Sequence, residues 1–122
     1  MAESDPASNG PDSLVVLWTR GDKEFAEEMA FMYTLNAAKY GWWDAVTLIV
    51  WGPSAPLLAE DEDLQATVSE MQDEGIAVEA CRACAEDFGV EEDLEAMDID
   101  VRYMGEALTD YLKDESTKLL EL

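Results

Sequence analysis

Residues 75–90, GIAVEACRACAEDFGV, show most clearly how strands alternate with helices in this chain. An apolar run, Ile76–Ala80, is followed by Cys81-Arg82-Ala83-Cys84 and by a segment that Gly89 closes, an order that predicts a strand, a cysteine and a helix. A thiol at that junction lies at the carboxyl edge of a strand and beside a helix N-terminus. There, unpaired backbone N–H groups favour an anion and can lower a cysteine pKa to roughly 3.5–7.5. Thiolate chemistry is therefore the first chemistry to consider.

The same alternation precedes this unit. The run LVVLW, residues 14–18, is apolar throughout, which predicts a parallel strand buried on both faces. A turn then leads into a helix over residues 23–40, whose apolar residues recur at helical spacing and which Gly41 ends. A second run, VTLIVW at residues 46–51, predicts the next strand.

Turn residues and glycines divide the rest of the chain in the same way. After the turn Gly52-Pro53-Ser54, a helix capped by Ser54 is expected to run to Glu74, and Gly75 ends it before the strand Ile76–Ala80. Downstream we expect a short helix closed by Gly89, a helical stretch near Glu91–Met97, a strand at Ile99–Met104, a helix with Leu108, Tyr111 and Leu112, and a fifth strand within Thr117–Leu122.

Strands that alternate with helices, with no hairpin turn between neighbours, indicate an α/β fold with parallel pairing. We expect a single compact domain over residues 13–122, with a five-stranded, mainly parallel sheet and helices on both faces. Residues 1–12, MAESDPASNGPD, have no periodicity and are expected to form a disordered acidic N-terminal lead-in. At 122 residues, one core is sufficient.

Ligands of such sheets bind beyond the carboxyl ends of the strands. These ends define a candidate binding crevice beside Cys81, although the strand order that would bring its loops together is not visible in the sequence. Its predicted members are Thr19, Arg20, Gly21, Gly52, Pro53, Ser54 and Gly105. Arg20 could hold an anion or a persulfide there, or form a surface ion pair with one of the many acids.

The cysteine pair has several alternative interpretations. The chain contains no histidine, so a Cys–His nucleophile pair is excluded within one chain. A zinc site would need two further ligands from carboxylates or another subunit, and we expect no metal. A thioredoxin-like pair normally follows the first strand of its unit and an aromatic residue, whereas this one follows the third strand and Ala80. Two buried cysteines without chemistry remain an alternative.

Phosphate-binding patterns are absent from the sequence. Neither a Walker motif nor G-x-G-x-x-G occurs, so an ATP-dependent or nicotinamide-dependent enzyme is disfavoured and no cofactor is expected.

The charge is extreme: 29 acids against 7 basic residues give a net charge of −22. Nucleic acid would be repelled. With 48% hydrophobic residues the chain should still fold, so the acids are expected on helix surfaces, as in adaptation of a halophilic protein to a salt-rich cytoplasm. The alternative is an acidic docking surface for a basic partner. With no signal peptide, no membrane span and no disulfide framework, we expect a cytoplasmic protein that does not enter a membrane.

Four tryptophans are expected to serve packing rather than direct ligand contact. Trp42 and Trp43 follow a helix end, and with the methionines of residues 23–40 they predict an apolar contact between copies of the chain.

The stretch from Leu14 to Leu122 resembles the DsrE/DsrF-like family of small sulfur-relay proteins, with LVVLWTRGDKEFAEEMAFMYTLNAAKYGWWDAVTLIVWGPSAPLLAEDEDL as its first half and GIAVEACRACAEDFGV as the most specific motif. In that family, a cysteine after the third strand, eight residues before a glycine, carries sulfane sulfur as a persulfide. Cys81 and Gly89 match this spacing. Cys84 occupies a position where members vary. The resemblance implies a trimeric or hexameric homo-oligomer, with sulfur donor and acceptor proteins as partners.

Two functions of different class follow. The first is a sulfur carrier or sulfurtransferase in which Cys81 holds sulfane sulfur, with Cys84 as an auxiliary that resolves or shields the persulfide. The second is a non-catalytic oligomer that binds a small molecule or a partner in the same crevice, with Cys81 incidental.

Overall fold

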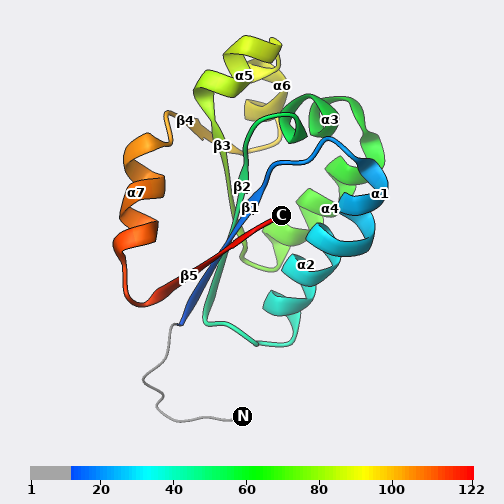
Figure 1. Ribbon diagram of the computed structural model, residues 1–122. Helices are drawn as coiled ribbons and strands as arrows, with labels where there is room; N and C mark the ends of the chain where they lie inside the picture. The colour runs from blue at the N-terminus through cyan, green and yellow to red at the C-terminus, as the bar shows by residue number, and fades with distance from the viewer. Residues whose placement is uncertain (1–11) are drawn as a thin grey trace.

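The computed structural model describes residues 12–122, which form one α/β domain (Figure 1). The strands are β1 Ser13–Trp18, β2 Ala45–Val50, β3 Ala77–Cys81, β4 Asp100–Arg102 and β5 Thr117–Glu121. The helices are α1 Lys23–Phe25, a π-helical turn η1 Ala26–Ala30, α2 Phe31–Lys39, α3 Ser54–Glu60, α4 Glu62–Asp73, α5 Arg82–Phe88, α6 Glu91–Glu95 and α7 Gly105–Lys113.

All strand pairs in the sheet are parallel, and the strand order is β4-β3-β2-β1-β5. The chain moves along the sheet in one direction from β1 to β4, then returns across it to place β5 beside β1. Because crossovers between parallel strands are right-handed, this return puts the connecting helix on the opposite face. Figure 1 shows α2 and α4 on one face and α7 on the other. The predicted fold class is confirmed, with a sheet that is wholly rather than mainly parallel.

The two faces of the sheet carry cores of different size, because successive side chains of a strand point to opposite faces. The face covered by α2 and α4 holds the larger core, to which β1 and β2 contribute Leu14, Val16, Trp18, Leu48 and Val50. The other face holds a small core of Val15, Ile49, Cys81 and Met104. The sulfur of Cys81 therefore lies on the thinly covered side of the sheet.

The helix expected over residues 23–40 forms with the predicted ends. The Asp22 carboxylate accepts a hydrogen bond from the Phe25 N–H at 3.2 Å, and Gly41 follows the last turn with a φ of +67°. The π-helical turn of η1 inside this helix was not predicted, because apolar spacing does not distinguish a five-residue from a four-residue hydrogen-bond step.

The prediction of a single helix from Ser54 to Glu74 is wrong. The backbone of Asp61 is extended, and its carboxylate accepts from the Leu64 N–H at 3.0 Å, so Asp61 caps a new helix, α4. This hydrogen bond and the Lys23 ammonium at 3.0 Å lower the pKa of Asp61. Ser54 is not a cap either: it makes no capping hydrogen bond at the start of α3.

Some predicted boundaries shift by one or two residues. β3 includes Cys81, and β4 ends at Arg102, two residues before Met104, which packs in the small core. The predicted lead-in lies outside the described residues except for Asp12, whose backbone bonds to Ser116 and to the N–H of Asp44. Within residues 12–122, no helix is long and apolar enough to cross a membrane.

Candidate functional site: a cysteine pair at the carboxyl edge of the sheet

Cys81 is the last residue of β3 and directly precedes α5. Its side chain is only 6% exposed and belongs to the small core with Ile49 and Met104. Its position at the carboxyl edge of a central strand is as predicted, but the thiol points under the cover of the domain rather than into open solvent.

Cys84 lies one turn into α5 and is half-buried, so it is the more accessible thiol of the pair. Its side chain packs against the small core that contains Cys81 and lies close enough to the backbone N–H of Gly52 to be influenced by it. Burial raises the pKa of Cys84 above its usual value, and Cys81 and Asp87 act in the same direction against the opposing Gly52 N–H. Cys84 is therefore predominantly a neutral thiol at pH 7.

The turn after β2 lies beside the pair, as the sequence predicts. Gly52, with a φ of +74°, supplies the N–H that meets Cys84. Ser54 is fully buried, and its hydroxyl donates to the Trp18 carbonyl oxygen at 2.7 Å. This hydrogen bond joins the end of β1 to the start of α3. Ser54 therefore has a structural role in the predicted crevice.

The turn after β1 is split between two environments. Gly21 packs against Pro53 and so borders the β2 turn. The Arg20 guanidinium lies 4.3 Å from the centroid of the Phe25 ring, in a surface hollow of about 350 Å³ that neither cysteine lines. Arg20 and its neighbour Thr19 thus belong to a different hollow from the cysteine pair.

Gly105, the last predicted crevice residue, begins α7. It directly follows Met104, whose side chain packs with Cys81. The structure therefore gathers the β2, β3 and β4 ends around the pair.

A buried carboxylate that was not predicted lies on the same face of β3. Glu79 is 8% exposed, and both of its oxygens are 3.0 Å from the Tyr111 hydroxyl, which donates to them from α7. Arg102 lies 3.1 Å from Glu79, across from Cys81 in the β3–β4 register, and 3.1 Å from Asp100. Burial, followed by the Glu79 hydrogen bond, raises the pKa of Tyr111. The signal in the sequence was a lone charge inside the run IAVEAC.

The arrangement is that of a dithiol under a partial cover. Cys84 is the more exposed of the two cysteines, and Cys81 is buried at the strand end in the same small core as Met104. Such a pair can accept a sulfur atom on one thiol and exchange it with the other, or can close to a disulfide.

Fold and site together define a small parallel α/β protein with a CxxC pair between its third strand and the following helix. The chain matches no family model and no curated protein. It is 42% identical to a solved structure described as a conserved protein of unknown function from Bacteroides thetaiotaomicron, with a TM-score of 0.86 over 91% of this chain and 95% of that one. The chain belongs to the family of that conserved protein.

Proposed function

We propose that the protein is a sulfur carrier of the sulfurtransferase type, with Cys81 as the residue that bears the sulfane sulfur. The observation that carries this proposal is the position of Cys81 at the carboxyl end of β3, with Cys84, one turn into α5, packed against the same small core. The resemblance of residues 75–90 to the DsrE/DsrF-like motif supports the choice of Cys81.

The loading step transfers one sulfur atom. Cys81 gives up its proton, and the thiolate attacks the outer sulfur of a donor persulfide, R–S–SH. The Cys81–S bond forms as the donor S–S bond breaks, which yields Cys81–S–SH and R–S⁻. An acceptor thiolate then attacks the outer sulfur in the same way and regenerates the Cys81 thiolate.

Cys84 offers a second outcome for the loaded state. Its thiolate can attack the inner sulfur of Cys81–S–SH, which forms a Cys81–Cys84 disulfide and releases HS⁻. Because the pKa of Cys84 is raised, little of the attacking thiolate forms near neutral pH, which favours transfer of the sulfur over release of HS⁻. A reducing cytoplasm would return the disulfide to two thiols.

One observation favours the second candidate, a non-catalytic binding protein. Cys81 is 6% exposed and packs with Val15, Ile49 and Met104 as a core residue would. In that case it would take up no sulfur from a donor.

Mass spectrometry after incubation with glutathione persulfide tests the proposal. We expect a gain of about 32 Da, one sulfur atom, on the peptide that contains Cys81, lost again with dithiothreitol. Cys81→Ser should abolish the gain, whereas Cys84→Ser should retain it and slow the release of sulfide. Sulfur loading that depends on Cys84 alone would make Cys84 the sulfur-bearing residue. If neither cysteine gains sulfur, the non-catalytic binding protein becomes the better explanation.

A further inference from the structure

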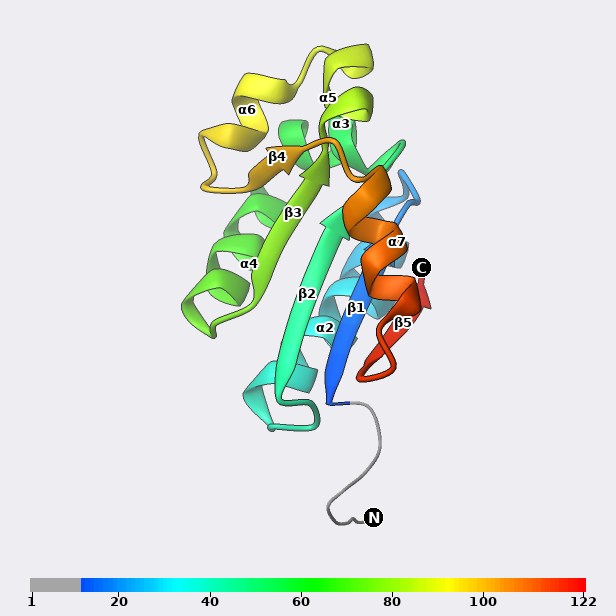
Figure 2. The same cartoon turned by 90° about the vertical axis from the view of Figure 1, so that its left-hand side faces the viewer.

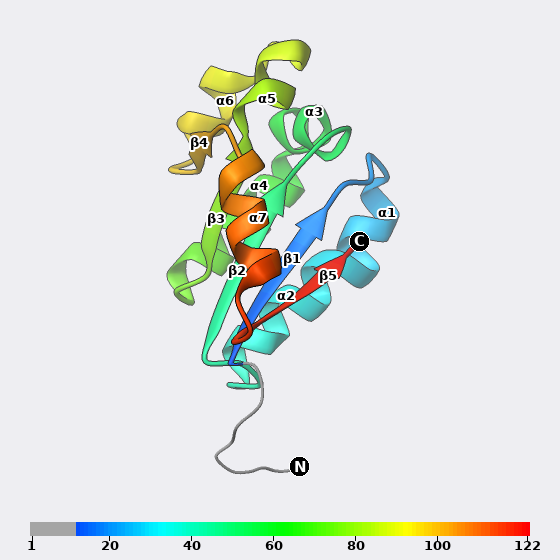
Figure 3. The ribbon, with the colours of Figure 1, turned by 60° about the vertical axis from the view of Figure 1, so that its left-hand side comes forward.

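The cover over Cys81 is thin. In the part of the chain that the structure describes, α7 is the helix that lies on the small-core face, and Figures 2 and 3 show it passing in front of the strands. None of its residues is fully buried, and Leu112 is 63% exposed. It packs Ala107 and Tyr111 against the small core that contains Cys81.

A polar contact ties this helix to the sheet. The Tyr111 hydroxyl donates to Glu79, and Glu79 is two residues before Cys81, so both side chains leave β3 on the same face. The tie and the thiol are therefore neighbours on one strand.

A carboxylate at position 79 has a cost in folding free energy. A carboxylate buried on a sheet face costs free energy unless it is paired, and an apolar side chain of similar size would serve packing equally well. Glu79 is paired on two sides, by Tyr111 from α7 and by Arg102 from β4. The presence of Glu79 is explained if α7 is held to the sheet by a polar contact that can break and re-form.

We propose that Glu79 and Tyr111 are positioning residues that hold α7 over Cys81, so that breaking their hydrogen bond exposes the thiol. The purpose of such a cover rests on the proposed sulfur transfer, since it would keep Cys81 shielded until a donor displaces α7. The physical claim, that this contact controls access to Cys81, stands apart from that function.

Alkylation of the two cysteines by iodoacetamide, followed by mass spectrometry of their peptides, measures access without any sulfur donor. In Tyr111→Phe, the hydroxyl is lost and the ring remains. We expect Cys81 to react about 10- to 150-fold faster, the range that corresponds to the net free energy of one hydrogen bond to a charged group. Cys84, which is already reachable, should keep its rate.

Tyr103→Phe is the matched control. Its hydroxyl also donates to a carboxylate, that of Glu86 at 3.1 Å, but on the exposed surface and towards α5 instead of the sheet. This variant should react as the unchanged protein does. Hydrogen exchange of residues 105–113 should quicken in Tyr111→Phe and not in Tyr103→Phe.

The pH profile separates access from electrostatics. The charged and titratable groups around Cys81 are Glu79 on its own strand, Arg102 and Asp100 from β4, Cys84 and Asp87 from α5, and Tyr111 from α7. If α7 only blocks access, its displacement multiplies the rate at which Cys81 reacts with iodoacetamide by the same factor at every pH. A change of the local field would instead shift the midpoint of the profile.

A double-mutant cycle tests whether Tyr111 acts through Glu79. Glu79→Met, which replaces the carboxylate by an apolar side chain of similar size, should accelerate Cys81 as Tyr111→Phe does, and the double variant should add nothing further. Equal Cys81 rates in Tyr111→Phe and Tyr103→Phe, a joint acceleration of both cysteines, or factors that multiply in the double variant would each overturn the inference. Failure of sulfur loading would leave it untouched.

Discussion

Gly21 lies against Pro53 so closely that a Cβ on Gly21 would stand 3.1 Å from the Pro53 carbonyl oxygen and 3.2 Å from its Cβ. These residues belong to the turns after β1 and β2, so the contact fixes the spacing of two strand ends at the edge where the cysteine pair lies.

Gly21→Ala should therefore destabilise the protein by about 1–3 kcal/mol, since backbone must move to admit the methyl group. Urea unfolding measures the change. Gly105→Ala is the control: nothing lies within 4 Å of its added Cβ, and alanine favours the helix start. That variant should be as stable as the parent or more so. If both substitutions had the same effect, the turn contact would have no energetic role.

Cys84 should ionise at higher pH in the folded protein than in the unfolded chain, because burial raises its pKa. Its rate of reaction with iodoacetamide, followed against pH, should have a higher midpoint than that of the same residue in urea. Since the unfolded chain then loses its proton first, this thiol lowers the free energy of unfolding as the pH rises through the unfolded pKa. A midpoint equal to or below the unfolded one would contradict the assignment.

Stability should increase with salt up to molar potassium chloride. At a net charge of −22, salt screens the repulsion that folding concentrates on the surface. The rise in Tm should be steepest at low salt, because the Debye length falls from about 30 Å at 0.01 M to about 10 Å at 0.1 M. A Tm that stays flat or falls over this range would argue for the acidic docking surface instead.

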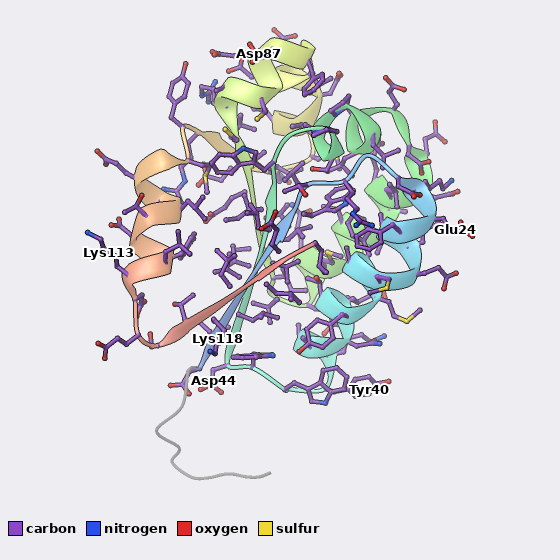
Figure 4. All side chains as sticks on the ribbon, in the orientation of Figure 1. Glu24, Tyr40, Asp44, Asp87, Lys113 and Lys118 are labelled. Carbon is purple, nitrogen blue, oxygen red and sulfur yellow. The ribbon has the colours of Figure 1, made fainter. Side chains whose placement is uncertain are left out.

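The aromatic end of α2 should mediate self-association. Residues 29–43 contain no acid, and Met29, Met32, Tyr40 and Trp42 are each at least half exposed there. The rings of Tyr40 and Trp42 are 5.7 Å apart between centroids and tilted by 32° to each other. Figure 4 shows Tyr40 far from Asp87, at the other end of the molecule. Copies of a strongly acidic chain repel one another least at such a surface.

Light scattering at high salt tests the association. We expect a trimer or hexamer of the 13.5 kDa chain, which Trp42→Glu should dissociate. Leu112→Glu introduces the same charge at an exposed apolar residue on α7 and should leave the assembly intact. A monomer for the unchanged protein would rule the association out.

Much of the fold could be predicted from a few runs of residues. LVVLW and VTLIVW are short runs rich in β-branched residues and followed by turn residues, which favours strands buried on both faces, and Gly41 and Gly89 end helices where expected. The break at Asp61 was missed because Leu57 and Leu64 keep helical spacing across it. Strand order could not be predicted, since it depends on long-range pairing that no local pattern encodes.

The parts of the site that come from consecutive residues could be predicted from the sequence. The contacts between residues of different strands and helices could not. The position of Cys81 at a strand end follows from the order of elements, whereas the approach of the Gly52 turn to Cys84 depends on the pairing of β2 with β3. The partners of Glu79 come from β4 and α7, 23 and 32 residues further on, so only the folded sheet reveals them. Arg20 was predicted as a possible neighbour of Cys81, but its guanidinium lies over the ring of Phe25, five residues further along the chain.

The pairing of β5 with β1 has a consequence for synthesis on the ribosome. β1 is made first, and β2 can cover one of its edges early, but its other edge waits for Thr117–Glu121. Throughout elongation the nascent chain thus carries a hydrophobic strand with one unsatisfied edge, a template for pairing with a neighbouring nascent chain. This exposure ends when β5 emerges and pairs with β1; the edge of the sheet then belongs to β5, whose Lys118 and Glu121 disfavour pairing with another chain.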